Sequence, residues 1–313
     1  MKKFNSRALV TGGAGFIGSH IIDRLIDNNI ETYVLVSGFR SYKHPSIINR
    51  DANIVKGDLR DYDTLKDITK ETDIVFHLGG IFSHYCEKYP DMAIDVNIKG
   101  MWNLKSACAS NGVDRIIFAS SSFVYGDPTK GCEYLNEECP TNAKDLLGIT
   151  KLAGEKILQS SHPDKVNYTI FRLFNVYGPR QYPDDLYTSV ISTWIKKALN
   201  RQPLEIHDDG TQSLDFVYVR DVADAFILAL DKRAENETFN VGSGTSISMN
   251  ELAMLVNKLT GNESSPFYNR SHPMFLRHVQ ADINKIKSIL GWSPRVNLEE
   301  GLQSTVDFFR RMV

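Results

Sequence analysis

The stretch Thr11-Gly12-Gly13-Ala14-Gly15-Phe16-Ile17-Gly18 decides the fold of this chain. It follows the apolar run Ala8-Leu9-Val10 and opens a segment, from about Gly15 to Asn28, whose apolar residues recur at helical spacing. Glycines at these points allow a tight turn and a close approach of the backbone to a pyrophosphate, which a helix N-terminus stabilises. A strand, a glycine loop and a helix in this order predict a dinucleotide-binding unit rather than an ordinary turn.

The same alternation of strands and helices continues along the chain. Strands are expected at 33–36, 53–55, 74–78, 115–119 and 168–171, with helices at about 94–109 and 148–159. Nearly continuous apolar strands separated by helices are typical of a parallel sheet that is covered on both faces. We predict an α/β fold: a Rossmann-type doubly wound parallel sheet in residues 1–178 and a smaller C-terminal α/β substrate-binding lobe in residues 179–313. A segment near 211–241 is expected to pack back on the first domain.

Composition excludes several classes of protein. The 313 residues include 36 basic and 38 acidic side chains, so no field of one sign favours nucleic acid or an anionic membrane. No apolar stretch approaches the roughly 20 residues of a membrane span, and the start of the chain does not resemble a signal peptide. Cys86, Cys108, Cys132 and Cys139 form no Cys-x-x-Cys pair, so we expect free thiols, no metal site and a cytoplasmic protein.

Further motifs follow the glycine loop in a fixed order. They are Gly57-Asp58-Leu59-Arg60-Asp61, His77-Leu78-Gly79-Gly80, Asn97-x-x-Gly100, Ser120-Ser121-Ser122-Phe123-Val124-Tyr125-Gly126, Phe174-Asn175-Val176-Tyr177-Gly178-Pro179, Asp215-Phe216-Val217-Tyr218-Val219 and Gly291-Trp292-x-Pro294. With these motifs the chain resembles the extended short-chain dehydrogenase/reductase family, in the branch of NAD-dependent sugar-nucleotide epimerases and dehydratases. It is most similar to members of the UDP-glucose 4-epimerase type.

The resemblance implies a set of cofactor-binding residues. They are Gly12, Gly15, Phe16, Ile17, Gly18, Ser37, Arg40, Asp58, Leu59, Leu78, Gly79, Gly80, Asn97, Lys151 and Tyr177. The second strand lacks the acidic residue that usually holds the adenosine ribose of NAD. Ser37 and Arg40 follow that strand instead, and an arginine there suits the 2′-phosphate of NADP. We expect NAD, with NADP as the alternative.

The catalytic helix departs from the family at one position. The family carries Tyr-x-x-x-Lys, in which the lysine binds the nicotinamide ribose and lowers the pKa of the tyrosine that takes the proton of a sugar hydroxyl. Lys151 matches, but Leu147 stands at the tyrosine position and cannot move a proton. Ser121 and Lys151 remain as expected catalytic residues, and His84 or Tyr85 are candidates for the missing acid–base group. Further candidates are Tyr125 and Tyr177.

Substrate recognition also departs from the family. The resemblance implies contacts to a nucleotide-sugar from Ser121, Ser122, Asn175, Arg180, Gln212 and Arg277. However, Leu214 and His272 replace arginines that usually bind phosphate. The carboxylates that serve dehydratases and decarboxylases are also absent, since Ser122 and Phe123 follow Ser121.

These features predict an NAD(P)-dependent epimerase or oxidoreductase that acts by hydride transfer on a nucleotide-linked sugar, most similar to the 4-epimerases. The alternative is a catalytically impaired homologue that binds the dinucleotide and serves as a binding or regulatory subunit. The resemblance also implies a homodimer formed through the helices at 94–109 and 148–159.

Overall fold

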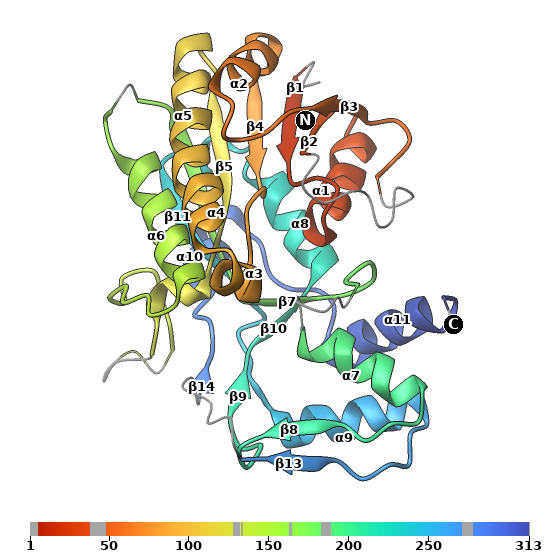
Figure 1. The fold of residues 1–313 in the computed structure, drawn as a ribbon. Helices are drawn as coiled ribbons and strands as arrows, with labels where there is room; N and C mark the ends of the chain where they lie inside the picture. The colour runs from red at the N-terminus through yellow and green to blue at the C-terminus, as the bar shows by residue number, and fades with distance from the viewer. Residues whose placement is uncertain are drawn as a thin grey trace. The chain divides into compact units, whose positions relative to one another are not determined.

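The chain forms two compact units (Figure 1). The structure is a computed structural model that describes residues 6–37, 48–127, 132, 134–162, 165–182, 189–270 and 278–312. The first unit comprises Met1–Val124, Ala143–Arg172 and Ala223–Phe239, and the second comprises Tyr125–Asn142, Leu173–Val222 and Asn240–Val313. Each unit is described by itself below.

A seven-stranded sheet forms the centre of the first unit. Its strands, in sheet order, are β11 (Glu237–Val241), β6 (Asn167–Leu173), β5 (Arg115–Ser121), β4 (Ile74–His77), β1 (Arg7–Thr11), β2 (Glu31–Val36) and β3 (Asn53–Lys56). Every pairing from β5 across to β3 is parallel. The order reverses next to β1, which is the place where doubly wound sheets bind dinucleotides. The predicted Rossmann-type architecture is confirmed.

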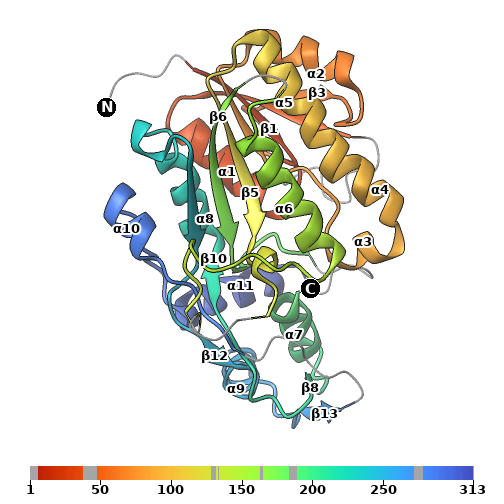
Figure 2. The same ribbon diagram turned by 90° about the vertical axis from the view of Figure 1, so that its left-hand side faces the viewer.

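Helices cover both faces of this sheet (Figure 2). The helices of this unit are α1 (Phe16–Asp27), α2 (Tyr62–Ile68), α3 (Ser83–Lys88), α4 (Pro90–Ile94), α5 (Gly100–Asn111), α6 (Leu146–Gln159) and most of α8 (Val219–Leu228). On one face Leu104 of α5 and Leu158 of α6 pack into a core with Ile116 of β5. On the other face the ring of Phe226 of α8 packs at a tilt against Phe76 of β4 and Phe171 of β6. The central strands β1, β4 and β5 are therefore buried on both sides, as their apolar sequences require.

The helix expected at 94–109 is longer and less regular than its sequence indicates. The helical run begins at Pro90, passes through a π-helical segment at Asp95–Lys99 and continues as α5 to Asn111. A π-helical turn inserts an extra residue and rotates a side chain away from regular spacing, often at a functional site. Here the turn contains Asn97, which is buried.

The second unit contains three small sheets and four helices among its described residues. The strand pairs are β10 (Phe216–Tyr218) with β7 (Asn175–Tyr177), and β13 (Phe267–Asn269) with β8 (Glu205–His207), while β9 (Ser213–Leu214) lies between β12 (Ile247–Ser248) and β14 (His278–Val279). The helices are α7 (Val190–Leu199), α9 (Met249–Thr260), α10 (Asn284–Leu290) and α11 (Leu298–Arg310). Residues of α7, α9 and α11, with Trp194 and Phe309 among them, form its apolar core.

A buried carboxylate organises this second unit. Asp215 is fully buried, and burial raises its pKa. Its two oxygens accept hydrogen bonds from the backbone amides of Ser243, Gly244 and Ala281 at 2.6–3.1 Å, and from the Ser243 hydroxyl at 2.7 Å. These bonds join the start of β10 to two loops that are distant in sequence.

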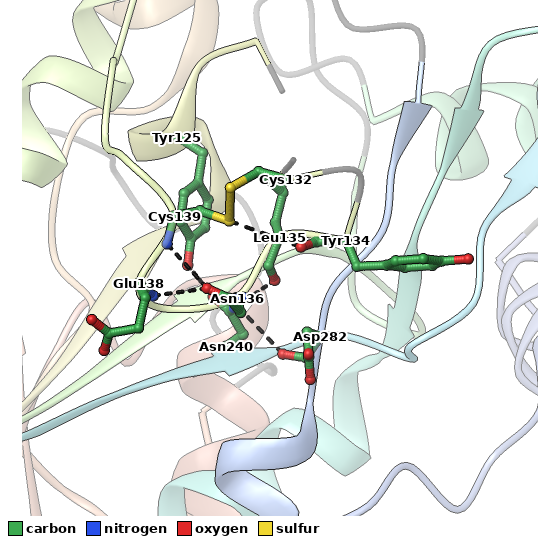
Figure 3. Close-up of a disulfide and its surroundings, with 9 residues drawn as sticks. All are labelled: Tyr125, Cys132, Tyr134, Leu135, Asn136, Glu138, Cys139, Asn240 and Asp282. Atoms are coloured by element: carbon green, nitrogen blue, oxygen red, sulfur yellow. Dashed lines mark hydrogen bonds between the residues drawn. A yellow bond between two sulfur atoms is a disulfide. The ribbon is translucent and has the colours of Figure 1, made fainter. Parts of the chain in front are cut away.

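Two of the four cysteines form a disulfide, so the expectation of four free thiols is wrong (Figure 3). Cys132 is bonded to Cys139, with their Cα atoms 6.1 Å apart, whereas Cys86 and Cys108 are free and buried. Spacing alone gave no signal, because the turn at Asn136 brings the two cysteines together. The Asn136 side chain accepts hydrogen bonds from the amides of Glu138 and Cys139 at 3.0 and 3.1 Å.

The loop closed by this disulfide is tied to the rest of its unit through Asn240 (Figure 3). The Asn240 side chain donates to the Leu135 carbonyl at 2.7 Å and accepts from the Tyr125 hydroxyl at 2.7 Å. Leu135 also pairs with the backbone of Gln280 and Asp282. The disulfide therefore restrains a loop whose centre is already hydrogen-bonded on both sides.

We predict that Cys139→Ser lowers the free energy of unfolding by about 2 kcal/mol, because the cross-link restricts the unfolded chain. Denaturant unfolding without reductant measures the difference, and a dithiol reductant should lower the wild type to the level of the variant. In the denatured, unreduced wild type, a thiol assay should find Cys86 and Cys108 only. Four reactive thiols in that assay would contradict the assignment.

Candidate active site

The glycine loop forms a cradle at the end of β1. Gly12 has φ +72°, and a side chain there would lie 2.6 Å from the backbone nitrogen of Gly79. A Cβ on Gly18 would collide with the Gly12 carbonyl. Gly15 precedes α1 and has no side chain to cap the free amides of its first turn. Those amides and the open backbone fit the pyrophosphate of a dinucleotide.

A buried histidine fixes the neighbouring strand to this loop. The Nδ1 atom of His77 lies 2.7 Å from the hydroxyl of Thr11, which also accepts the amide of Gly79 at 3.1 Å. Burial lowers the pKa of His77 to about 3, and the positive charge of Lys151 adds a smaller effect in the same direction. The ring is therefore neutral at physiological pH, and its tautomer decides whether Nδ1 or the Thr11 hydroxyl donates in this hydrogen bond. This link holds Leu78, Gly79 and Gly80 beside the glycine loop.

The residues expected to bind adenosine follow β2 and β3. Asp58 pairs with Arg60 at 2.7 and 2.9 Å, and these bonds hold the pKa of its carboxyl below the usual range. Leu59 packs closely against Gly79 and Gly100, where added side chains would collide with it. Ser37 is exposed at the end of β2, while Arg40 lies outside the described residues. The role of Arg40 thus stays a prediction.

Helix α6 approaches β5 closely at its first turn. Asp145 caps the helix by accepting the amide of Gly148 at 2.9 Å. A Cβ on Gly148 would lie 2.5 Å from the Phe123 carbonyl oxygen, so only glycine allows this approach. Leu147 is 8% exposed and packs with Ile81, Cys86 and the half-buried ring of Tyr85. An apolar cluster therefore surrounds the position where the family carries its tyrosine.

Lys151 lies one turn further along α6 and is 3% exposed. Its Nζ atom donates to the Ala119 carbonyl of β5 at 2.7 Å and lies about 5 Å from the ring centres of Phe82 and Phe118. Burial lowers the pKa of Lys151 to about 8, and the nearby Cys86 and Glu155 offset part of that effect. The structure thus holds a partly desolvated amine at the end of β5.

A buried ion pair fixes the register of α6 against the sheet. Glu155, one turn after Lys151, accepts two hydrogen bonds from Arg172 of β6 at 2.8 and 3.1 Å and one from the Ser120 hydroxyl of β5. All three side chains are buried. Ser120 directly precedes Ser121, so this network positions both expected catalytic residues. Ser120 belongs to one of the sequence motifs, but the spacing of the motifs did not predict its hydrogen bond to Glu155.

Ser121 and Ser122 stand where β5 ends and a 3₁₀ turn begins. The Ser121 oxygen accepts the Phe123 amide at 3.2 Å. That hydrogen bond leaves the hydroxyl proton of Ser121 available as a donor. Both serines are half-buried.

The candidates for the missing acid–base group occupy different environments. His84 lies on α3 with its side chain 52% exposed, and its Nδ1 is 3.2 Å from Glu87. Tyr85 is half-buried, stacks on Tyr89 and packs against the cluster that contains Leu147. The geometry favours Tyr85 over His84, and both roles stay predictions.

The remaining candidates belong to the second unit. The Tyr125 hydroxyl donates to Asn240, and the Tyr177 hydroxyl donates to the Leu298 carbonyl at 3.3 Å within the apolar core. Burial raises the pKa of the Tyr177 phenol. These contacts do not favour acid–base chemistry at either tyrosine, nor cofactor binding at Tyr177, which stays a prediction.

The expected substrate residues are only partly described. Asn175 donates to the Asp215 carbonyl at 2.9 Å, Gln212 is buried and donates to the His207 carbonyl at 2.9 Å, and Arg180 has φ +69°. Arg277 lies outside the described residues. Asn97, which was expected near the cofactor, accepts a hydrogen bond from the Ile81 amide at 2.7 Å. Its side-chain nitrogen donates to the Ile81 carbonyl and to the Thr150 hydroxyl, both at 3.0 Å. These roles stay predictions.

Two negative findings apply to the part of the chain that the structure describes. There, no three histidine, cysteine or acidic side chains gather as metal ligands. The described helices are also too short or too polar to cross a bilayer.

A glycine cradle at the switch point of a parallel sheet, with a buried lysine and two serines at the end of β5, defines a dinucleotide-dependent enzyme fold of the short-chain dehydrogenase type. Residues 8–242 match the model of the NAD dependent epimerase/dehydratase family. This chain belongs to that family, which confirms the resemblance and the NAD cofactor drawn from its sequence.

Known relatives agree with this membership. A Methanocaldococcus jannaschii protein provisionally named a UDP-glucose 4-epimerase is 36% identical over 308 residues, which span 96% of this chain and 98% of the relative. A Bacillus cytotoxicus UDP-N-acetyl-alpha-D-glucosaminuronate decarboxylase is 30% identical over 100% of this chain and 99% of its own length. The Thermotoga maritima UDP-glucose 4-epimerase, solved with UDP-glucose, is 33% identical, with a TM-score of 0.89 and coverage of 98% and 99%.

We predict that Gly15→Asp lowers the affinity for NAD by about 100-fold or more, because it places a carboxylate beside a pyrophosphate. Gly15 has φ −87°, and an added Cβ would lie 3.1 Å from the Gly12 carbonyl oxygen, so the backbone tolerates a side chain after a small shift. Gly15→Asn makes the same steric contact without the charge and is the matched control. Calorimetric titration with NAD measures both, and equal affinities for the two variants would contradict the assignment.

Proposed function

We propose that this protein is an NAD-dependent epimerase that inverts a ring carbon of a UDP-linked sugar, with C4 as the reacting carbon. The observation that carries the proposal is that Ser121 ends β5 and the glycine cradle follows β1 in one parallel sheet, in which only β4 separates these strands, while Lys151 of α6 is bonded to the end of β5. The solved Thermotoga relative is a 4-epimerase and was crystallised with UDP-glucose. A UDP-sugar is thus the ligand class of first choice.

The residues present fit the cofactor. The glycine loop and the first turn of α1 would hold the pyrophosphate, and Asp58 and Leu59 would contact the adenine. Bound NAD supplies an acceptor for the hydride of the sugar carbon. Lys151 would hold the nicotinamide ribose, and the free hydroxyl proton of Ser121 would orient the sugar oxygen. Asn175, Arg180, Gln212 and Arg277 are proposed to bind the nucleotide part.

Epimerisation is favoured over elimination and decarboxylation by the residues that follow Ser121. Ser122 and Phe123 begin the 3₁₀ turn there and carry no carboxyl group. A decarboxylase relative is nevertheless 30% identical to this chain. Product analysis by NMR after incubation with UDP-glucose and UDP-glucuronate distinguishes an epimer from a decarboxylated pentose.

The second candidate function is a non-catalytic NAD-binding subunit, which Leu147 favours. It predicts tight NAD binding without conversion of any UDP-sugar. A panel of UDP-sugars, assayed for epimer formation and for reduced nicotinamide, tests both functions. Conversion of any member supports the enzyme.

Replacement of Leu147 by tyrosine tests the proposed site directly. A phenol one helical turn before Lys151 would have its pKa lowered by the ammonium group and would serve as a proton acceptor. We expect Leu147→Tyr to raise the rate of hydride transfer on the order of 100-fold. Leu147→Phe supplies the same ring without the hydroxyl and should give no gain. Equal effects of the two variants in single-turnover measurements would refute this placement of residue 147.

We also propose a homodimer formed through α5 and α6, which lie side by side (Figure 2). Trp102 of α5, Ile149 of α6 and Ile94 of α4 are 42–46% exposed in the single chain. Trp102→Glu should shift sedimentation towards the monomer, because a charge at an apolar interface is costly. Met254→Glu alters an apolar residue of α9 that is 63% exposed and is the control. A wild type that is monomeric at micromolar concentration would overturn the proposal.

A further inference from the structure

Two lysines of the described residues, Lys105 and Lys151, are buried, and their hydrogen bonds differ. Lys105 of α5 is fully buried, and its ammonium donates to the carbonyls of Ile157, Ser160 and His162 and to the Ser160 hydroxyl at 2.6–3.1 Å. Its hydrogen-bonding capacity is filled, and it caps the end of α6. Lys105 is therefore a structural lysine.

Lys151 is almost as deeply buried but makes one hydrogen bond to the described residues, to the Ala119 carbonyl. Aromatic rings of Phe82 and Phe118 flank its Nζ atom and accept no conventional hydrogen bond. An ammonium group carries three donors, so two positions around this nitrogen are not used by the residues that the structure describes. A buried polar group with unused capacity is costly unless a ligand or a function requires it.

The titratable groups that face Lys151 cannot take over its proton chemistry. His77 of β4 has its Nδ1 engaged by Thr11 and is neutral. The Cys86 thiol of α3 donates to the Ile81 carbonyl at 3.2 Å, and burial raises its pKa to about 11. Glu155 of α6 is held by Arg172 and Ser120. Leu147, one turn before Lys151, has no titratable group.

We propose that the Nζ atom of Lys151 itself exchanges the proton of the sugar hydroxyl, in the role that the absent tyrosine would fill. This inference rests on the proposed function and names the proton carrier for it. The neutral amine takes the hydroxyl proton: the O–H bond breaks, an N–H bond forms at Nζ, and the sugar carbon loses its hydride to the bound dinucleotide as the alcohol becomes a ketone. In the return step the ammonium gives the proton back to the oxygen.

The low dielectric around Nζ makes this role possible near neutral pH. Burial lowers the pKa of Lys151 to about 8, so a substantial share of neutral amine exists at physiological pH. A solvent-exposed lysine, with a pKa near 10.4, would be almost wholly protonated there. The neutral amine is the active form in sugar oxidation, so the rate should rise with pH up to about 8 and then level off.

Titration of Lys151 tests the inference without any turnover. In protein labelled with ¹³C at the lysine Cε atoms, the resonance that disappears in Lys151→Met should titrate near pH 8, well below the exposed lysines. A midpoint above 10 would overturn the inference whatever the activity. Because this measurement needs no substrate, it separates failure of the inference from failure of the proposed function.

Two variants test the chemistry with NAD and UDP-glucose. Lys151→Arg keeps the positive charge but gives up no proton at neutral pH, so we expect NAD binding to persist and hydride transfer to fall at least 100-fold. In Leu147→Tyr/Lys151→Arg the phenol supplies a proton acceptor beside a fixed cation, and activity should return. A lysine needed only for binding or structure predicts no such recovery.

If arginine at position 151 disturbs the fold, restoring the activity of a smaller variant with added amines tests the same inference. Lys151→Ala leaves a space into which small primary amines can diffuse, and rescued rates should depend on the pKa of the added amine. Rescue that is independent of amine pKa would show a structural role and overturn the inference.

Full activity in Lys151→Arg with loss of activity in Tyr85→Phe would overturn it too, and would assign the proton to Tyr85. Absence of turnover in the wild type and in Leu147→Tyr would reject the proposed function itself.

Discussion

The hydrogen bond from Lys151 to the Ala119 carbonyl is the contact on which the site depends. It joins the middle of α6 to the end of β5, where Ser121 follows two residues later. The bond forms only because Gly148 lets α6 approach the turn at Phe123. Glu155, one turn later, makes a second connection to β5 through Ser120 and a third to β6 through Arg172. Charged groups thus fix a helix that apolar packing alone would leave free to slide.

The expected cofactor site of the first unit also depends on the close approach of two backbone segments, the glycine loop after β1 and the residues after β4. Gly12 lies so near the backbone of Gly79 that a side chain on Gly12 would collide with it, and a Cβ on Gly79 would lie 3.0 Å from the Thr11 hydroxyl oxygen. The neutral ring of His77 and the hydroxyl of Thr11 hold this arrangement. Since burial and Lys151 both disfavour a charged imidazole, the site contains one cationic group at this point rather than two. His77 of β4 thus interacts both with the charge of Lys151 and with Thr11, the residue that precedes Gly12.

The sequence predicted the sheet and its glycine loop well, because both depend on local patterns. Buried parallel strands are continuous apolar runs, and the loop needs glycine at defined positions. The sequence could not predict the π-helical turn at Asn97, since this turn depends on hydrogen bonds to Ile81 and Thr150 from distant segments. The Cys132–Cys139 disulfide was missed because a turn at Asn136 creates the proximity. Tertiary packing likewise gives the Nζ atom of Lys151 one hydrogen bond to the described residues, whereas it gives that of Lys105 four acceptors.

We propose that this chain transfers a hydride at C4 of a UDP-sugar although Leu147 replaces the expected tyrosine. Isotope tracing in the wild-type protein tests it most directly. UDP-glucose that carries deuterium at C4 is incubated with the NAD-loaded protein, and the product is analysed by NMR and mass spectrometry. The account predicts a C4 epimer that keeps its deuterium and takes none up from deuterated water. Loss of the label to solvent, or unchanged UDP-glucose in the presence of bound NAD, would contradict it.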